Sequence, residues 1–231
     1  QKLTFRVLRY MDYALSKEQN SKVSEDKVDA LRMLTEPLRN EIKYMVSYAC
    51  LKNHPIFERC GSACYGLVNT ALSVKSLAAG DMLFKIGTQG THMYIVQSGK
   101  LQYLPQASSS PSTRISEIGH FGPATVEKND WVSEAVLWTT TWLHVGTAQA
   151  DCECRIVAVE SKAFMAQITK DMMSCGICSM YANAFVAWLN SMPLTHVSDL
   201  SSEASLGIAA SLMETGAFSS MSRVKSTSTM A

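Results

Sequence analysis

Cysteine side chains are the residues of this sequence that could most readily do chemistry, as nucleophiles or as metal ligands. Six of the seven cysteines fall into three close pairs: Cys60-x3-Cys64, Cys152-x-Cys154 and Cys175-x2-Cys178. These spacings repeat no known zinc finger, and no histidine stands at ligand spacing beside them. We therefore favour reduced, mostly buried thiols over the alternative of a zinc site, and expect no metal.

Histidines could serve in general acid-base catalysis, but the five are dispersed along the chain. They are His54, His92, His120, His144 and His196. No Ser/His/Asp, Cys/His or phosphate-loop signature of the right context accompanies them. The sequence thus does not indicate an enzyme. With a net charge of +1 and no cluster of five or more basic residues, it does not indicate a nucleic-acid partner either.

The bulk composition is that of a globular protein. The 231 residues are 47% hydrophobic and 18% charged, enough for one domain of ordinary size with an accessory segment. No charged region followed by an apolar core and a cleavage site comes after Gln1, so we expect no secretory signal. We expect the sequence to be a piece of a longer protein.

The centre of the chain is rich in short apolar runs that predict β-strands. Between Gly80 and Leu104 there are three such runs: Met82–Phe84, Met93–Val96 and Leu101–Leu104. Glycines stand where the chain must turn, at Gly80, Gly87 and Gly99, and glycine enters positive φ without steric cost. We predict an antiparallel meander here. Residues 114–122, 143–150 and 155–159 continue the strand pattern and predict a small β-roll.

Helical periodicity flanks this β-rich region on both sides. Apolar residues recur at steps of three and four over parts of residues 1–54 and again over residues 161–189. No charged residue occurs from Met172 to Ser198, a length that could span a membrane. Its polar small residues favour instead a buried helix pair covering the β-roll. Past Asp199 the chain is rich in Ser and Thr, and we expect little order.

Two resemblances to known proteins follow one another along the chain. Gly80-Asp81, an apolar strand, a glycine turn, a strand ending at Ser98-Gly99 and a further strand resemble the first half of the cyclic nucleotide-binding domain. That family is a β-roll flanked by helices, with a pocket for cyclic AMP or cyclic GMP. Ahead of it, residues 6–13, 36–42 and 54–57 look like the C-linker of voltage-gated and cyclic nucleotide-gated channels.

The resemblance implies an α+β fold in three parts. Residues 1–54 would form a helical C-linker, and residues 55–198 an antiparallel, jelly-roll-like β-roll flanked by helices. Residues 199–231 would form a flexible Ser/Thr-rich tail.

Two stretches compete for the family's nucleotide-binding cassette, Phe-Gly-Glu-x-Ala-Leu, which precedes an arginine and a strand ending in alanine. Phe121-Gly122 supplies the first two letters, but Pro123 replaces the glutamate. The stretch Trp131–Leu137 keeps the glutamate, alanine and leucine and lies at nearly the right distance from Ala150. We therefore favour the second placement.

This placement assigns five ligand-binding residues by resemblance: Ser133, Glu134, Ala135, His144 and Val145. Glu134 would accept a hydrogen bond from the ribose hydroxyl, and Ser133 replaces the family's glycine. His144 stands where the family has its phosphate-binding arginine. A mostly neutral imidazole offers no bidentate fork, which lowers affinity by about ten- to a hundredfold. We expect weak or absent binding of cyclic AMP or cyclic GMP, and no other cofactor.

Three tryptophans crowd the same segment, at Trp131, Trp138 and Trp142. They could fill the pocket from within, as intrinsic side chains do in the channel branch that no longer binds nucleotide. They could equally be ordinary core residues, and the sequence leaves both interpretations open.

The resemblance implies a non-catalytic regulatory module of a cation channel, such as a potassium channel. It would lie on the cytoplasmic face of a membrane, attached to a pore outside this sequence, and assemble as a homo-tetramer through residues 1–54. The alternative is a scaffold or assembly subunit that uses the same fold as a protein-interaction surface. A kinase regulatory subunit is a third hypothesis, but such proteins usually carry two tandem domains and no C-linker.

Overall fold

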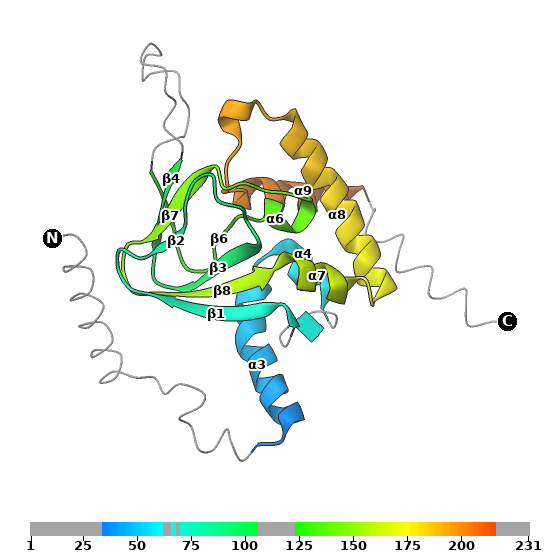
Figure 1. Cartoon of the computed structure of the whole chain (residues 1–231). Coiled ribbons are helices and arrows are strands. Elements are labelled where there is room, and N and C mark those ends of the chain that lie inside the picture. The colour runs from blue at the N-terminus through cyan, green and yellow to red at the C-terminus, as the bar shows by residue number, and fades with distance from the viewer. Residues whose placement is uncertain (1–33, 62–65, 68–69, 106–122, 216–231) are drawn as a thin grey trace, which may run out of the picture. The chain divides into compact units, whose positions relative to one another are not determined.

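The computed structural model describes residues 34–61, 66–67, 70–105 and 123–215 (Figure 1). The chain divides into two compact units, residues 1–45 and 46–231. The helix α3 (Glu36–Leu51) crosses this division. The predicted helices before residue 34 and the predicted strand over residues 114–122 lie outside the described residues.

The described part of the first unit is the beginning of α3. Pro37 occupies its first turn, where the missing N–H costs no hydrogen bond. Leu38, Ile42 and Met45 recur at helical spacing and are all exposed.

The second unit contains two four-stranded antiparallel sheets that form a β-roll. In one sheet the order is β1 (Leu72–Leu77), β8 (Cys154–Glu160), β3 (His92–Ser98) and β6 (Trp131–Val132). In the other it is β2 (Met82–Phe84), β7 (Gly146–Ala150), β4 (Leu101–Pro105) and β5 (Ala124–Val126). The predicted antiparallel β-roll is confirmed.

The predicted meander is wrong in its pairing. β2, β3 and β4 do not pair with one another: β2 and β4 both pair with β7, and β3 pairs with β8 and β6. Successive strands are shared between two sheets because both sheets must contribute apolar faces to one core. The glycines make this possible, since Gly80, Gly87 and Gly99 all have positive φ, at 86°, 74° and 86°.

Side chains from both sheets meet in the core of the roll. Strand alternation places Leu101 and Tyr103 of β4 inside while Gln102 between them is exposed. The core residues of the two sheets are Phe84, Tyr94, Val96, Leu101, Tyr103, Val126, Val132, Ala148, Ala150, Cys154, Ile156 and Ala158.

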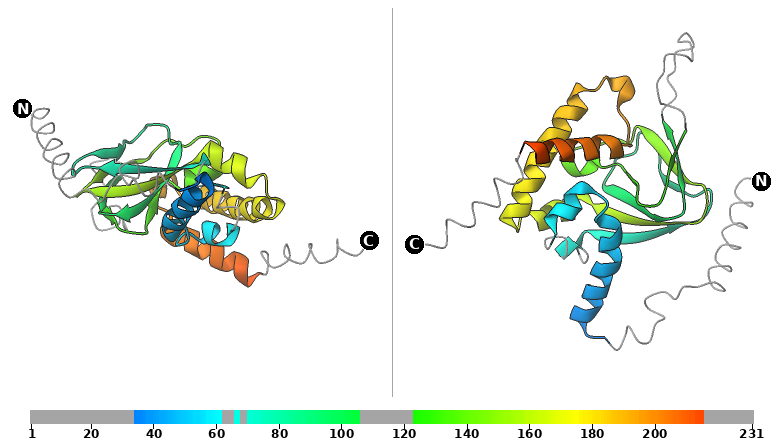
Figure 2. Two further views of the ribbon diagram at one scale, coloured as in Figure 1. Left: turned by 90° about the horizontal axis from the view of Figure 1, so that it is seen from below. Right: turned by 180° about the vertical axis from the view of Figure 1, so that it is seen from behind.

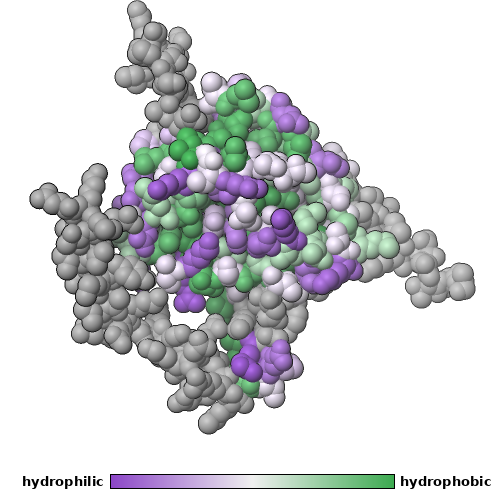
Figure 3. Space-filling view, viewed as in Figure 1, coloured by the Kyte–Doolittle hydropathy of each residue, from purple (hydrophilic) through white to green (hydrophobic). Residues whose placement is uncertain are grey.

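Helices gather at one end of the roll, as the views from below and behind agree (Figure 2). They are α4 (Pro55–Cys60), α6 (Ala135–Trp138), α7 (Ser161–Ile168), α8 (Met172–Ser191), the short 3-10 helix η2 (Leu194–His196) and α9 (Ser202–Glu214). Hydrophilic and hydrophobic residues are interspersed over the face seen in Figure 3.

The helix α8 accounts for most of the charge-free stretch. Asp171 caps its N-terminus by accepting a hydrogen bond from the Ser174 amide at 2.8 Å. By length and composition alone, α8 is long and apolar enough to cross a membrane. Core helices of soluble proteins can have the same length and composition. Tyr181 and Phe185 are buried, and α8 packs against α4, α7 and α9.

The structure differs from the prediction for the start of the tail. Residues 202–214 form the helix α9, although we expected little order there. Composition misled the prediction because small serines and alanines suit a helix that packs closely: Ser205 and Ala209 of α9 are buried. Residues 216–231 lie outside the described residues.

Candidate functional site

The candidate site is built around the turn between β6 and α6, at which Ser133 lies. Ser133 has a φ of 63°, in the left-handed region that costs an ordinary residue roughly 1–2 kcal/mol. This is the position at which the cassette of the resemblance carries glycine. The Ser133 amide donates to the backbone carbonyl of Asp199 at 2.7 Å, so the turn is held by a segment far along the chain.

Asp199 lies between η2 and α9 and places its carboxylate inside the roll, where the residue is only 1% exposed. Its Oδ2 accepts hydrogen bonds from the backbone amides of Val145 at 2.9 Å and Gly146 at 3.0 Å. The same oxygen accepts from the hydroxyl of Tyr103 at 3.1 Å. Consecutive backbone amides pointing at one anion form the kind of concavity that binds phosphate groups in proteins.

The other oxygen of Asp199 is held by side chains. Its Oδ1 accepts from the indole of Trp142 at 2.8 Å and lies 2.9 Å from Nδ1 of His144. The hydroxyl of Ser133 approaches the same oxygen at 3.4 Å. Because a carboxylate only accepts hydrogen bonds, His144 must carry a proton on Nδ1. We call Asp199 and its six donors, Ser133, His144, Val145, Gly146, Trp142 and Tyr103, the Asp199 cluster.

Two donors of this cluster, His144 and Tyr103, are restrained by their surroundings. The imidazole of His144 stacks on the ring of Phe84, with centroids 3.8 Å apart and an interplanar angle of 9°. Burial, followed by the charge of Asp199, raises the pKa of Tyr103 far above its usual value. The Tyr103 hydroxyl is therefore a permanent donor in the physiological pH range.

Glu134 lies next to Ser133 in sequence but faces a second polar cluster. The residue is fully buried. One carboxylate oxygen accepts from the indole of Trp138 at 3.0 Å and the hydroxyl of Tyr181 at 2.8 Å, and lies 3.1 Å from Nε2 of His54. The other accepts from the indole of Trp131 at 2.9 Å and from the hydroxyls of Ser201, at 3.2 Å, and Ser205. We call these seven residues the Glu134 cluster.

The tautomer of His54 follows from its own contacts. Nδ1 of His54 accepts a hydrogen bond from the Ile56 amide at 3.3 Å and so caps α4. The proton is therefore on Nε2, which faces Glu134. Burial raises the pKa of Glu134, but the proximity of His54 and the hydrogen bonds from Ser205 and Trp138 outweigh it and lower the pKa to about 2. Glu134 is an ionised carboxylate saturated with protein donors.

The structure thus brings the five predicted site residues together, with different surroundings. Ser133, His144 and Val145 all contact Asp199. Ala135 is buried at the start of α6. Glu134 binds groups of the protein itself, and its role as a ribose acceptor stays a prediction.

The structure supports core packing of the three tryptophans, and their filling of a nucleotide pocket stays a prediction. Trp131 and Trp142 are buried, and Trp138 is half-buried. Each also donates its indole N–H to one of the two carboxylates. They are core residues that hold the charged groups of the site.

Sequence reasoning missed Asp199, which supplies the carboxylate at the centre of the first cluster. The available signal was that Asp199 is the first charged residue after the charge-free stretch that ends at Ser198.

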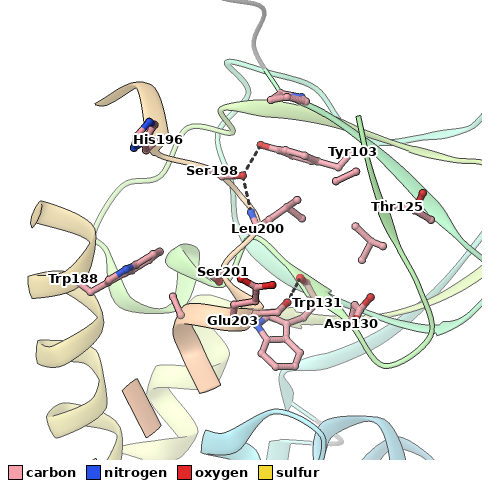
Figure 4. Close-up of a pocket in the computed structure, with 15 residues that line it drawn as sticks. Tyr103, Thr125, Asp130, Trp131, Trp188, His196, Ser198, Leu200, Ser201 and Glu203 are labelled. Atoms are coloured by element: carbon pink, nitrogen blue, oxygen red, sulfur yellow. Dashed lines mark hydrogen bonds between the residues drawn. The ribbon is translucent and has the colours of Figure 1, made fainter. Parts of the chain in front are cut away.

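A pocket of about 730 Å³ adjoins the segment that carries Asp199 (Figure 4). It is lined from several elements, including Tyr103 of β4, Thr125 of β5 and Trp188 of α8. Ser198 and Leu200 line it from the Asp199 segment, where the Leu200 amide donates to the Ser198 hydroxyl at 3.1 Å. The five predicted site residues do not line this pocket, but Tyr103 of the Asp199 cluster and Trp131 and Ser201 of the Glu134 cluster do.

Among the residues that the structure describes, no group of three or more His, Cys, Asp or Glu side chains could hold a metal ion.

Comparison with known proteins identifies the class of the β-roll. Residues 74–171 match the cyclic nucleotide-binding domain. The matched residues run from within β1 to just past α7 and include Ser133, Glu134 and His144. The resemblance of this region to the cyclic nucleotide-binding domain is confirmed, and that family is regulatory rather than catalytic.

The chain is similar in sequence to several channel proteins. It is 27% identical over 124 residues to a cyclic nucleotide-gated channel of Caenorhabditis elegans, a match covering 54% of this chain and 16% of that one. It is 29% identical over 126 residues to human cyclic nucleotide-gated channel alpha-3, a match covering 54% of this chain and 17% of that one. It is 26% identical over 141 residues to human potassium/sodium hyperpolarization-activated cyclic nucleotide-gated channel 3, a match covering 61% of this chain and 16% of that one. The match therefore spans about a sixth of each relative.

Solved structures with similarity to the chain include bacterial proteins. One is the N-terminal domain of a transcriptional regulator from Streptomyces coelicolor A3(2), with a TM-score of 0.48 and 20% identity, covering 62% of this chain and 97% of that one. Another is the sensor domain of the transcriptional regulator DNR from Pseudomonas aeruginosa, with a TM-score of 0.48 and 16% identity. This match covers 67% of this chain and 98% of that one.

Proposed function

We propose that this chain is the regulatory module of a cation channel, lying on the cytoplasmic face of a membrane, whose cyclic nucleotide pocket is occupied by its own Asp199. The observation that carries the proposal is the carboxylate of Asp199 on the amides of Val145 and Gly146. The resemblance counts the family's phosphate arginine to His144, the residue just before these amides. An internal anion therefore uses the donors that a cyclic phosphate would need.

Weak or absent nucleotide binding follows from this occupation. A nucleotide binds only the fraction of molecules in which Asp199 has left, so its apparent affinity is the intrinsic affinity multiplied by that fraction. The buried position of Asp199 and its several charge-assisted hydrogen bonds keep the fraction small. His144 in place of arginine weakens binding further, because one imidazole N–H cannot grip two phosphate oxygens.

Occupation of the pocket would be coupled to the helices through Glu134. The segment that carries Asp199 continues into Ser201 and Ser205, which donate to Glu134. Glu134 also contacts His54, just before α4, and Tyr181 of α8. Displacing the segment would remove donors from Glu134 and shift the population of helix arrangements, which is how a pocket biases a linker.

The direct test is calorimetric titration of the chain with cyclic AMP and cyclic GMP. We expect no saturable heat below roughly 0.1 mM nucleotide, corresponding to less than about 6 kcal/mol of binding free energy. A Glu134→Ala variant serves as the control for any heat that is seen. Micromolar binding by the unaltered chain would contradict the proposal, because Asp199 could not then be an effective occupant.

Assembly as a tetramer through residues 1–54 is also part of the proposal. Its support in the described residues is the exposed apolar row of α3, in which Leu38, Ile42 and Met45 are 47%, 40% and 66% exposed. Such a stripe at helical spacing is typical of a helix that packs against a partner.

We expect Met45→Glu to shift the chain from tetramer to monomer in sedimentation equilibrium. A charge in an apolar contact is costly to desolvate and disrupts assembly. The matched control is Val74→Glu, since Val74 is 47% exposed on β1 and should not affect assembly. A chain that is monomeric before substitution would contradict this part of the proposal.

The filled pocket also favours a second candidate, a scaffold or assembly subunit that uses the fold only to bind other proteins. The two candidates differ once Asp199 is removed: a regulatory pocket regains nucleotide binding, whereas a scaffold need not.

A further inference from the structure

We propose that Cys60 and Cys178 form a redox modification site, in which a small peroxide joins the two thiols as a disulfide that links α4 to α8. The two sulfur atoms lie 3.5 Å apart, although their residues are 118 positions apart in the chain. Cys60 is the last residue of α4, and Cys178 lies in the second turn of α8. Both are almost fully buried, at 4% and 3% exposure.

The geometry requires only a small change to form the bond. A disulfide has a sulfur–sulfur distance of about 2 Å, so the two atoms must approach by roughly 1.5 Å. We expect rotation of the two side chains within the α4–α8 contact to supply this movement. Larger separations would demand backbone movement, which packed helices resist.

Cys60 is the sulfur suited to react first. Its hydrogen bond with Cys178, together with one from Ser174, lowers the pKa of Cys60 against the opposing effects of burial and of Asp171. The thiolate is the reactive form of cysteine, and a nearby second thiol can resolve the first product.

The reaction balances with one peroxide molecule. The Cys60 thiolate attacks one oxygen of hydrogen peroxide, the O–O bond breaks, and hydroxide leaves and takes a proton to become water. Cys60 is now a sulfenic acid. The thiol of Cys178 then attacks the Cys60 sulfur, the S–S bond forms, the S–O bond breaks, and the leaving hydroxide takes the Cys178 proton as a second water. The two sulfurs lose two electrons and the peroxide gains them.

Other described cysteines are less suited to this chemistry. Burial raises the pKa of Cys50, and burial with the neighbouring Cys152 raises that of Cys154 to about 11. The Cys154 thiol also donates to the Lys100 carbonyl at 3.0 Å. Cys152 is exposed on the turn between β7 and β8. Cys175, one turn before Cys178 on α8, is half-buried and is the competing partner that an experiment must separate.

The link would join two helices that meet at the Glu134 cluster. His54 caps the N-terminus of α4, and Tyr181 lies one turn after Cys178 on α8. Since both contact Glu134, a covalent link between α4 and α8 stabilises the same arrangement. Closing so long a loop typically raises the melting temperature of a protein of this size by about 5–10 °C.

The test uses residues 1–231 with Cys64→Ser and Cys175→Ser, so that each relevant tryptic peptide keeps a single cysteine. The peptides are residues 60–75 and 171–223. After treatment with hydrogen peroxide we expect these two peptides to be joined, with the loss of two hydrogens and separation by dithiothreitol. The melting temperature of the oxidised protein should rise and return on reduction.

Two variants complete the design. Cys178→Ser should abolish both the joined peptides and the rise in melting temperature, while Cys152→Ser should change neither. The inference is overturned if the folded protein yields no joined peptides, if Cys60 stops at the sulfinic acid, or if the link forms without raising the melting temperature. Neither readout involves nucleotide, so the result is independent of the proposed function.

Discussion

Replacing Asp199 by alanine should raise the affinity of this domain for cyclic AMP and cyclic GMP by about ten- to a hundredfold. The substitution removes the carboxylate that competes for the amides of Val145 and Gly146, so the nucleotide no longer has to displace it. The size follows from the loss of charge-assisted hydrogen bonds, each worth about 1.5–3 kcal/mol, of which the incoming phosphate recovers part.

The same variant should be less stable when empty. Donors of the Asp199 cluster, including the indole of Trp142 and the hydroxyl of Tyr103, lose their acceptor and are left for water. We expect a fall in melting temperature of roughly 4–10 °C, partly reversed by millimolar nucleotide. Calorimetry gives the affinity, and thermal denaturation with and without nucleotide gives the stability.

A matched control is available on the same segment. Glu203→Ala removes an equal charge from the first turn of α9, but Glu203 is exposed and has no contact with Val145 or Gly146 among the described hydrogen bonds. Its affinity should equal that of the unaltered chain. A folded Asp199→Ala protein that shows neither heat nor thermal shift with millimolar nucleotide would rule out a regulatory pocket and favour the scaffold.

Replacing Glu134 by glutamine should destabilise the domain more than any other single substitution considered above, by about 3–5 kcal/mol. Glutamine keeps the shape but turns one acceptor oxygen into an NH2 donor, which then faces donors. Tyr181 and Ser205 lie on separate parts of the chain and direct O–H groups at this carboxylate, and Nε2 of His54 lies 3.1 Å from it. Urea denaturation at pH 7 measures the loss, and Glu203→Gln, an exposed site, is the control.

Acid should reproduce part of this loss in the unaltered chain. The pKa of Glu134 is lowered to about 2 in the folded state, against an ordinary value of 4.5, so the unfolded chain binds a proton more readily than the folded chain. The stabilisation is therefore complete above about pH 4.5 and is lost as the pH falls toward 2. The shift corresponds to roughly 3 kcal/mol, because each pH unit of difference is worth about 1.4 kcal/mol.

The measurement is the free energy of unfolding by urea between pH 7 and pH 3, compared between the unaltered chain and Glu134→Gln. Other carboxylates titrate equally in both, so the difference between the two curves reports Glu134. We expect that difference to shrink as the pH falls below 4.5. Parallel curves would show that the folded state does not hold Glu134 ionised.

Much of the fold could be predicted because it depends on local features of the sequence. Glycine at positions 80, 87 and 99 predicts sharp turns, because glycine adopts positive φ without steric cost, and all three have positive φ. Apolar alternation fixes which side chains of β4 and β7 point inward. Counting along the cassette from Ala150 placed Ser133 and His144 near one another, and they lie 3.2 Å apart, Oγ to Nδ1.

What the tertiary structure decided is which distant groups meet. Local pattern could not show that β2 and β4 both pair with β7, because pairing depends on sheet closure and not on the strand's own residues. Nor could it show that Asp199 occupies the amides after His144, or that Glu134 faces His54. A buried carboxylate is stabilised by whichever donors the packed helices bring to it, and those donors come from positions that no local sequence rule connects.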